Sequence, residues 1–191
     1  MRDLFGQPTT PAIPAGLRYQ DDLIPLPLAD ALVERIRTLP FKAFDFHGFK
    51  GLRRVVSYGR RYDFAAGRLK RAEALPDFLH PLREAAAGFA GVGPTALGHA
   101  LVTEYAPGAP IGWHRDRPEF DKVVGVSFLS PCVLRFRRRT GDRWERFGLT
   151  LQPRSAYLLD GDARQVWEHS IAPASALRYS VTFRTLRTVS P

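Results

Sequence analysis

The sequence predicts a mainly β protein with flanking helices, an α+β chain whose core is a jelly roll. From residue 100 onward, short apolar segments of strand character recur at regular intervals between turn signals, which is typical of a sandwich or jelly roll. Two segments with helical periodicity precede them, and we expect both helices to cover one sheet from outside. At 191 residues and 45% hydrophobic content, the chain 1–191 is expected to form a single domain with a sizeable core.

The first third of the chain is expected to support this core. Residues 1–27 carry five prolines and predict an extended N-terminal arm with at most one short strand. Leu28–Leu39 has its large apolar residues on one helical face and stops before a proline, which predicts a helix. Residues 41–72 mix aromatic residues with glycines and predict a region of hairpins. Pro76–Phe89 predicts the second helix.

The jelly-roll core is expected over residues 100–187. Turn signals such as Pro107-Gly108 and Asp160-Gly161 separate its strands. The predicted strands are Ala100–Tyr105, Val123–Leu129, Val133–Arg138, Glu145–Leu151, Ser155–Leu159, Val166–Ile171 and Arg178–Leu186.

Composition limits the possible surroundings and partners. The net charge of +9 attracts polyanions, of which nucleic acid is the commonest, although an arginine-rich solvated surface would give the same number. The single cysteine, Cys132, excludes an intramolecular disulfide and is expected to be a buried thiol. No membrane-length apolar run or secretory signal is visible, so we expect a cytoplasmic protein without a membrane partner, and a monomer by default.

Five residues of the core form the most informative pattern. His114 and Asp116 lie two positions apart, which on an extended strand places both on one face, and His169 follows on a later strand. Two imidazoles and one carboxylate leave open coordination positions and suit Fe(II) that binds an organic acid and O2 together. Arg178 and Arg184 share a face of the last strand, where a guanidinium fork can hold a carboxylate of 2-oxoglutarate. Because they would lie about 20 Å apart on an extended strand, we expect them to serve different ends of that ligand, or only one of them to bind it directly.

These residues occur in segments that resemble the AlkB family of Fe(II)- and 2-oxoglutarate-dependent dioxygenases: TEYAPGAPIGWHRD, LQPRSAYLLDGDARQVWEHSI and RYSVTFR. The resemblance implies a double-stranded β-helix with His114, Asp116 and His169 as the catalytic iron ligands. It implies that Arg178 binds the far carboxylate of 2-oxoglutarate and Arg184 the carboxylate near the iron. Tyr105 and Thr103 are implied as further contacts of this cosubstrate, although relatives often carry Asn at the position of Thr103.

Substrate residues are predicted on and near the hairpin region. Tyr62, with Tyr58 or Phe64 beside it, is expected to stack on a flipped base, although ordinary hairpin packing would use the same aromatics. Arg60 and Arg61 would then contact phosphates. Family members that repair DNA place a carboxylate soon after the HxD motif. Arg117-Pro118 follow here, and Glu119 or Asp121 could substitute only if the loop turns differently.

The sequence thus predicts a dioxygenase that dealkylates N-alkylated nucleobases in DNA or RNA, with succinate, CO2 and an aldehyde as products. Fe(II), 2-oxoglutarate and O2 are the expected cofactor and cosubstrates, and nucleic acid is the expected partner. The same chemistry on a protein side chain or a small metabolite is the alternative, because the carboxylate after the HxD motif is missing. A non-catalytic nucleic-acid-binding protein is a more remote one.

Overall fold

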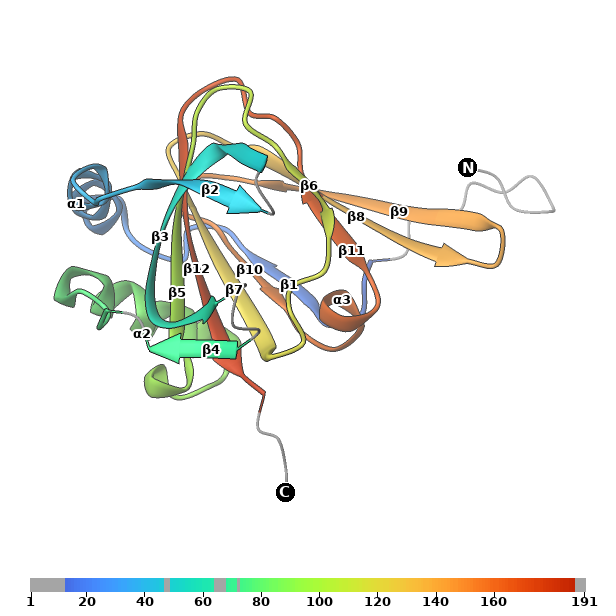
Figure 1. The fold of residues 1–191 in the computed structure, drawn as a ribbon, viewed down its shortest axis with the longest axis horizontal. Helices are drawn as coiled ribbons and strands as arrows, with labels where there is room; N and C mark the ends of the chain where they lie inside the picture. Colours follow the sequence, from blue (N-terminus) through green and yellow to red (C-terminus); the bar gives the residue numbers. More distant parts are fainter. Residues whose placement is uncertain (1–12, 47–48, 64–67, 72, 188–191) are drawn as a thin grey trace.

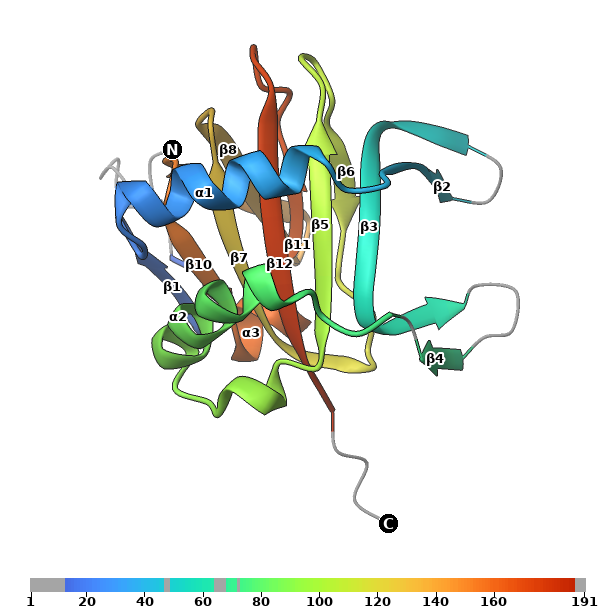
Figure 2. The same cartoon turned by 90° about the vertical axis from the view of Figure 1, so that its left-hand side faces the viewer.

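Two antiparallel sheets pack face to face, and two helices cover the outer surface of the larger sheet (Figure 1, Figure 2). The computed structural model describes residues 13–46, 49–63, 68–71 and 73–187, apart from the side chains of 45–51 and 60–72. The mainly β class with a double-stranded β-helix core is therefore confirmed.

The larger sheet has eight strands and is centred on β12 (Arg178–Leu186), which lies between β7 and β5. Eight of the nine residues of β12 are buried, because helices cover one face of this sheet and the smaller sheet covers the other. The strand order is β1-β10-β7-β12-β5-β3-β2, with β4 paired to β3. The remaining strands are β1 (Leu17–Gln20), β2 (Lys42–Phe46), β3 (Phe49–Asp63), β4 (Arg68–Arg71), β5 (His99–Tyr105), β7 (Phe120–Phe128) and β10 (Ala156–Leu159).

The smaller sheet has four strands in the order β6-β11-β8-β9. Its outer pair forms a long hairpin that projects beyond the sandwich (Figure 1). The strands are β6 (Ile111–His114), β8 (Cys132–Thr140), β9 (Arg143–Leu151) and β11 (Glu168–Ile171).

Both predicted helices exist, with shifted ends. The first, α1, covers Leu26–Arg37, because Pro27 fits the first turn, where its missing N–H costs no hydrogen bond, and the chain turns at Thr38. The second splits into a short 3-10 turn and α2 (His80–Ala90), which ends at Gly91 in the left-handed region. No described helix is long and apolar enough to cross a membrane. The short segments are η1 (Asp77–Leu79), η2 (Pro94–Ala96) and α3 (Gly161–Gln165).

Apolar side chains fill two layers of the molecule. One lies between the helices and the larger sheet and includes Leu32, Leu82 and Val181. The other lies between the two sheets and includes Phe136, Trp167 and Cys132, whose thiol is buried as predicted. The polar site described next shares the space between the sheets with this second layer, so its groups are shielded from water.

Candidate active site

The inward face of β12 carries a row of polar side chains. Strand alternation places Arg178, Ser180, Thr182 and Arg184 on the same side, and all four are buried. Their partners on β5 are Tyr105 opposite Arg178, Thr103 opposite Ser180, Leu101 opposite Thr182 and His99 opposite Arg184. The expectation that the two arginines share a face at opposite ends of the strand is confirmed.

Two imidazoles meet on the smaller sheet. His114 on β6 is the direct cross-strand partner of His169 on β11, and their ring centroids are 4.3 Å apart. Asp116 follows two residues after His114, beyond the end of β6. The sequence argument assumed an extended strand through the whole HxD motif, but β6 ends at His114. A loop therefore positions the carboxylate.

Asp116 joins the two sheets through Arg184. The Arg184 Nη2 atom donates to Asp116 Oδ1 at 3.0 Å, and each side chain is only 10% exposed. Burial alone would raise the pKa of Asp116, but the positive charge of Arg184 and the neighbouring imidazoles hold this pKa well below its ordinary value. The carboxylate is therefore ionised throughout the physiological pH range, which is the state that a metal requires.

The donor set fits an Fe(II) ion. The His114 Nδ1–H group donates to the Gly112 carbonyl at 2.9 Å, which leaves Nε2 for a metal. Burial, followed by the nearby His114, lowers the pKa of His169 to about 3, so its ring stays neutral and can act as a ligand. In the described ranges no three such side chains already stand at metal-binding distances, and Arg184 holds the Asp116 carboxylate. His114, His169 and Asp116 are the residues that would hold the ion.

His99 fixes the other side of the Arg184 guanidinium. Its Nδ1 atom lies 3.3 Å from Arg184 Nη1, and its ring packs 4.9 Å from that of Phe120. Burial, together with the charge of Arg184, lowers the pKa of His99 to about 3. The neutral ring can accept a hydrogen bond from the arginine, so Arg184 is held between an imidazole and the Asp116 carboxylate.

Arg178 lies buried at the opposite end of the row, and two of its donors are unused within the described residues. Its side chain is 1% exposed, its guanidinium lies 4.6 Å from the centroid of the Tyr105 ring, and Nη2 donates to Ser127 Oγ at 2.9 Å. Its Nε and Nη1 atoms have no hydrogen-bond partner within the described part of the chain. A buried guanidinium with two free donors is suited to a carboxylate ligand.

The Tyr157 ring lies across Gly125, its cross-strand partner on β7. A Cβ atom on Gly125 would overlap that ring, so the glycine is required for this close approach. Burial raises the pKa of Tyr157 well above its ordinary value, and the charges that act on it include those of Asp116 and Arg178. This phenol therefore belongs to the lining of the site.

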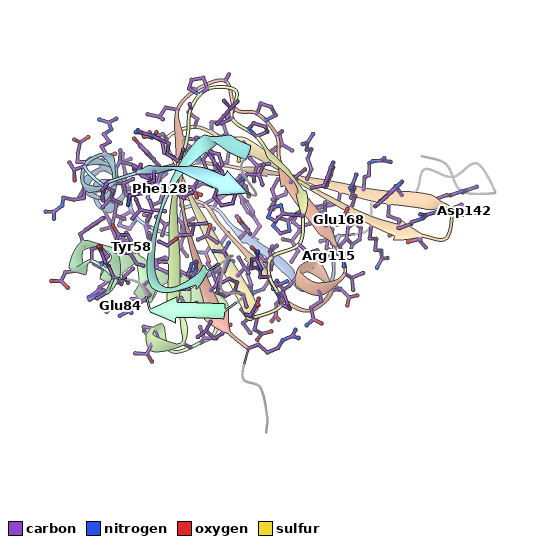
Figure 3. All side chains as sticks on the ribbon, viewed as in Figure 1. Tyr58, Glu84, Arg115, Phe128, Asp142 and Glu168 are labelled. Carbon is purple, nitrogen blue, oxygen red and sulfur yellow. The ribbon has the colours of Figure 1, made fainter. Side chains whose placement is uncertain are left out.

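The predicted substrate residues have different outcomes. Tyr58 is buried in the core beneath the helices, on the opposite face of β3 from the site (Figure 3). Its cross-strand partner Ala100 faces that core too, so the prediction that Tyr58 stacks on a base is corrected. Phe64 lies outside the described residues, as do the side chains of Tyr62, Arg60 and Arg61, whose predictions stay untested.

Glu119 remains a candidate at the start of β7. Its Oε2 atom is buried and has no hydrogen-bond partner among the described residues. Its backbone carbonyl accepts from the N–H of Arg187. This oxygen of a carboxylate after the HxD motif is therefore unused, and within the described residues no hydrogen bond or ion pair joins Glu119 to the iron ligands.

Sequence reasoning missed several residues of the site. The missed positions are His99, Gly125, Ser127, Tyr157 and Arg164. Arg164 Nη2 donates to the backbone carbonyls of Arg117 and Phe120, in and beside the loop that follows Asp116. Strand alternation offered a signal for His99, which lies on the face of Tyr105 and Thr103. The role of Gly125 offered none, since it depends on the pairing of β7 with β10.

A double-stranded β-helix that encloses two imidazoles, a carboxylate and inward arginines defines an iron- and 2-oxo-acid-dependent oxygenase. Residues 44–184 match the model of the 2OG-Fe(II) oxygenase superfamily, and the chain belongs to this family. The structure of OsALKBH1 superposes with a TM-score of 0.69 at 13% identity, over 91% of this chain and 100% of that one. A Pseudomonas putida prolyl-4-hydroxylase gives a TM-score of 0.64 at 15% identity over 90% and 93% of the two chains. These structural likenesses show the shared fold.

Curated relatives of the AlkB type match part of the chain. The chain is 32% identical over 145 residues to the alkylated DNA repair protein ALKBH8 homolog of Arabidopsis thaliana, which covers 62% of this chain and 41% of that protein. It is 31% identical over 123 residues to the alpha-ketoglutarate-dependent dioxygenase AlkB of Escherichia coli, over 58% and 56% of the two proteins. The chain thus spans about half the length of these relatives, and the AlkB resemblance is confirmed at the level of distant homology.

Proposed function

We propose that this oxygenase oxidatively dealkylates N-alkylated nucleobases in DNA or RNA. The observation that supports this most directly is the chain's similarity, at about 30% identity, to a protein named for alkylated DNA repair and to AlkB itself. The net charge of +9 agrees with a polyanionic substrate.

Two groups of residues would bind the ligands, one at each end of the polar row formed by Arg178, Ser180, Thr182 and Arg184 on β12. His114, Asp116 and His169 would hold Fe(II). Arg184 keeps the Asp116 carboxylate ionised and oriented and would meet the carboxylate of 2-oxoglutarate near the iron. Arg178 would pair its free Nε and Nη1 donors with the far carboxylate.

The hydroxyl groups between the arginines would complete the cosubstrate site. Tyr105 Oη lies 3.3 Å from Ser180 Oγ, and Thr103 is buried opposite Ser180 on β5. When bound, iron and 2-oxoglutarate supply the oxidising chemistry, which divides O2 between succinate and a hydroxylated substrate while CO2 leaves. Cleavage of the carbon–nitrogen bond of the N-hydroxyalkyl product then gives the aldehyde and the restored base.

A protein side chain or a small metabolite is the second candidate substrate class. One observation favours it: Arg117-Pro118 follow the HxD motif, and within the described residues Glu119 forms no hydrogen bond or ion pair with the iron ligands. A purely binding role is the third, and the preserved ligand set and the family argue against it.

The test has two stages. Succinate formation from labelled 2-oxoglutarate is measured with Fe(II) in the wild type, in His114→Ala, and in His80→Ala as a matched control on α2. Turnover that His114→Ala abolishes and His80→Ala preserves establishes the oxygenase. Mass spectrometry then follows oligonucleotides with 1-methyladenine, 3-methylcytosine or ethenoadenine, in single- and double-stranded DNA and RNA. If turnover occurs while every substrate keeps its alkyl group, the nucleobase proposal is wrong.

A further inference from the structure

The outer face of the smaller sheet carries a second group of functional side chains, separate from the iron ligands. Strand pairing sets His169, Phe136 and Phe147 in one row on the inward face. The residues next to them therefore point outward, away from the interior. The outward-facing residues are Trp113, Arg135, Arg137, Arg139, Trp144, Arg146 and Glu168.

This outer face, which we call the arginine face, is strongly basic. The hairpin of β8 and β9, from residue 132 to 151, contains six arginines and two acidic residues, a net +4 out of the +9 of the whole chain. Arg137 and Arg146 are directly opposed across the two strands. Like charges at such positions destabilise a sheet; Glu168 offsets the charge of Arg137, and an anion bound beside Arg146 would relieve the rest of the repulsion.

Aromatic rings hold the arginine face in shape. The Arg137 guanidinium carbon lies 4.5 Å from the ring of Trp113 and 4.5 Å from that of Trp144, and Nε donates to Glu168 at 2.7 Å. Arg135 also stacks on Trp113, at 5.3 Å. Such stacking fixes the guanidinium groups with little remaining entropy to lose on binding.

The outer half of the hairpin keeps its charges available. Arg139 and Arg146 are exposed; the first contacts only the Gly141 carbonyl and, at 3.9 Å, Asp142, while the second has no ion-pair partner in the described ranges. At the other end, the exposed Arg115 lies 4.0 Å from Glu168 and next to the iron ligand His114. Figure 3 shows Arg115 and Glu168 together at the base of the hairpin and Asp142 at its far end. Positive charge thus extends from the hairpin tip to the edge of the site.

We propose that the arginine face binds the sugar-phosphate backbone of a nucleic-acid strand and leads it toward the active site. Arg135, Arg137 and Arg139 recur every second residue, about 6.8 Å apart on an antiparallel strand, which is comparable to the spacing of successive phosphates along an extended strand. The flanking Trp rings offer surfaces on which bases can stack. The choice of nucleic acid as the polyanion rests on the proposed function; the location of the binding face does not.

Protection of a sheet edge is the simpler explanation for charge on β9, an edge strand. That explanation requires charge at the edge alone. It accounts neither for the arginines of β8, which is an interior strand, nor for the opposed pair of Arg137 and Arg146. An acidic peptide or an anionic membrane would use the same charge but would offer no bases to stack on the rings.

The test compares two double variants with the same loss of charge. Arg139→Gln/Arg146→Gln removes exposed charge from the arginine face, and Arg35→Gln/Arg37→Gln removes it from α1, on the opposite side of the molecule (Figure 1). Both are made in the His114→Ala background, so binding is read without turnover. Fluorescence anisotropy gives the Kd of a labelled, unmodified single-stranded oligonucleotide at several salt concentrations. Thermal unfolding and succinate formation, the latter in the active background, check that the hairpin variant stays folded.

We expect the hairpin variant to bind at least fivefold more weakly and to lower the slope of log K against log salt by about 1.4, since each phosphate contact on a single strand contributes about 0.7. The α1 variant is expected to keep the wild-type Kd. Equal weakening of both variants would overturn the proposal, because charge alone would then explain binding. So would tighter, Arg139- and Arg146-dependent binding to polyglutamate or to vesicles of equal parts phosphatidylserine and phosphatidylcholine. Binding that survives while all alkylated substrates stay intact would sink the dealkylase proposal and leave the arginine face in place.

Discussion

Arg178 offers the sharpest test of the cosubstrate site, because its removal should have opposite effects with and without ligand. The perturbation is Arg178→Met, which keeps much of the side-chain volume and removes the charge. In the ligand-free protein, Arg178 is a 1% exposed cation with two donors that have no partner within the described residues. Each buried unsatisfied donor costs about 1–3 kcal/mol, whereas the hydrogen bond to Ser127 returns about 1 kcal/mol. The ligand-free variant should therefore be more stable, by about 1 kcal/mol or more.

Bound 2-oxoglutarate should make the wild type the more stable of the two proteins. At a concentration of 2-oxoglutarate 100-fold above its Kd, with Mn2+ in place of iron, the wild type gains about 2.7 kcal/mol from binding. For a domain of 191 residues this raises Tm by about 5–10 °C. The variant should show little of this shift, because the far carboxylate of the ligand loses its guanidinium partner.

The assay is denaturant and thermal unfolding of wild type, Arg178→Met and the exposed control Arg37→Met, each with and without 2-oxoglutarate. The control is expected to match the wild type in both states, since its partner Glu34 lies on the surface as well. A ligand-free Arg178→Met protein that is several kcal/mol less stable, yet keeps the full ligand-dependent shift, would refute the argument. Arg178 would then be a packing residue of the core.

Three further predictions concern the residues around the row. Gly125→Ala should weaken 2-oxoglutarate binding and lower the free energy of unfolding by about 1–3 kcal/mol, because the new Cβ displaces the Tyr157 ring; unchanged titration and melting curves would contradict this. Because the folded-state pKa of His99 lies at about 3, below the unfolded value, stability should fall as pH drops below about 6.5, by about 2 kcal/mol at pH 5 from this residue. Urea midpoints across this range should flatten in His99→Gln, and an unaltered slope would reject the assignment. Arg164→Met should lose the bonds to two loop carbonyls, reduce stability by about 1–3 kcal/mol and weaken metal affinity through Asp116, as Mn2+ titration would measure; intact affinity would count against that coupling.

Most strands of the core and the five principal site residues could be predicted because each rests on a local pattern. Alternation in the last strand placed Arg178 and Arg184 on one face, and the structure confirms this over Arg178–Leu186. Sequence patterns failed where the backbone leaves regular geometry. The HxD motif lies half on β6 and half on a loop, and α3 replaces a predicted turn because Asp160 caps the N–H of Gly161.

Faces of strands in the hairpin region could not be predicted in the same way. Tyr58 lies in an aromatic, glycine-containing segment where either face was plausible, and only the register of β3 on β5 decides that it faces the helices. The register likewise places Gly125 opposite Tyr157, a long-range pairing with no local signature. Site residues that depend on register are thus the ones that sequence reasoning misses.

The polar side chains on the inward face of β12 and around it reduce the stability of the fold compared with an apolar core. A core of apolar side chains at these positions would not contain a buried guanidinium with free donors, a histidine held neutral, or a carboxylate held ionised. The Arg178 guanidinium in particular lowers the stability of the ligand-free protein, and its two free donors would gain a partner when a dicarboxylate binds. On the surface, the exposed Arg139 and Arg146 of the hairpin are the charges that a phosphate would pair with. Unsatisfied charge in both places therefore indicates which ligand chemistry the chain is prepared to accept.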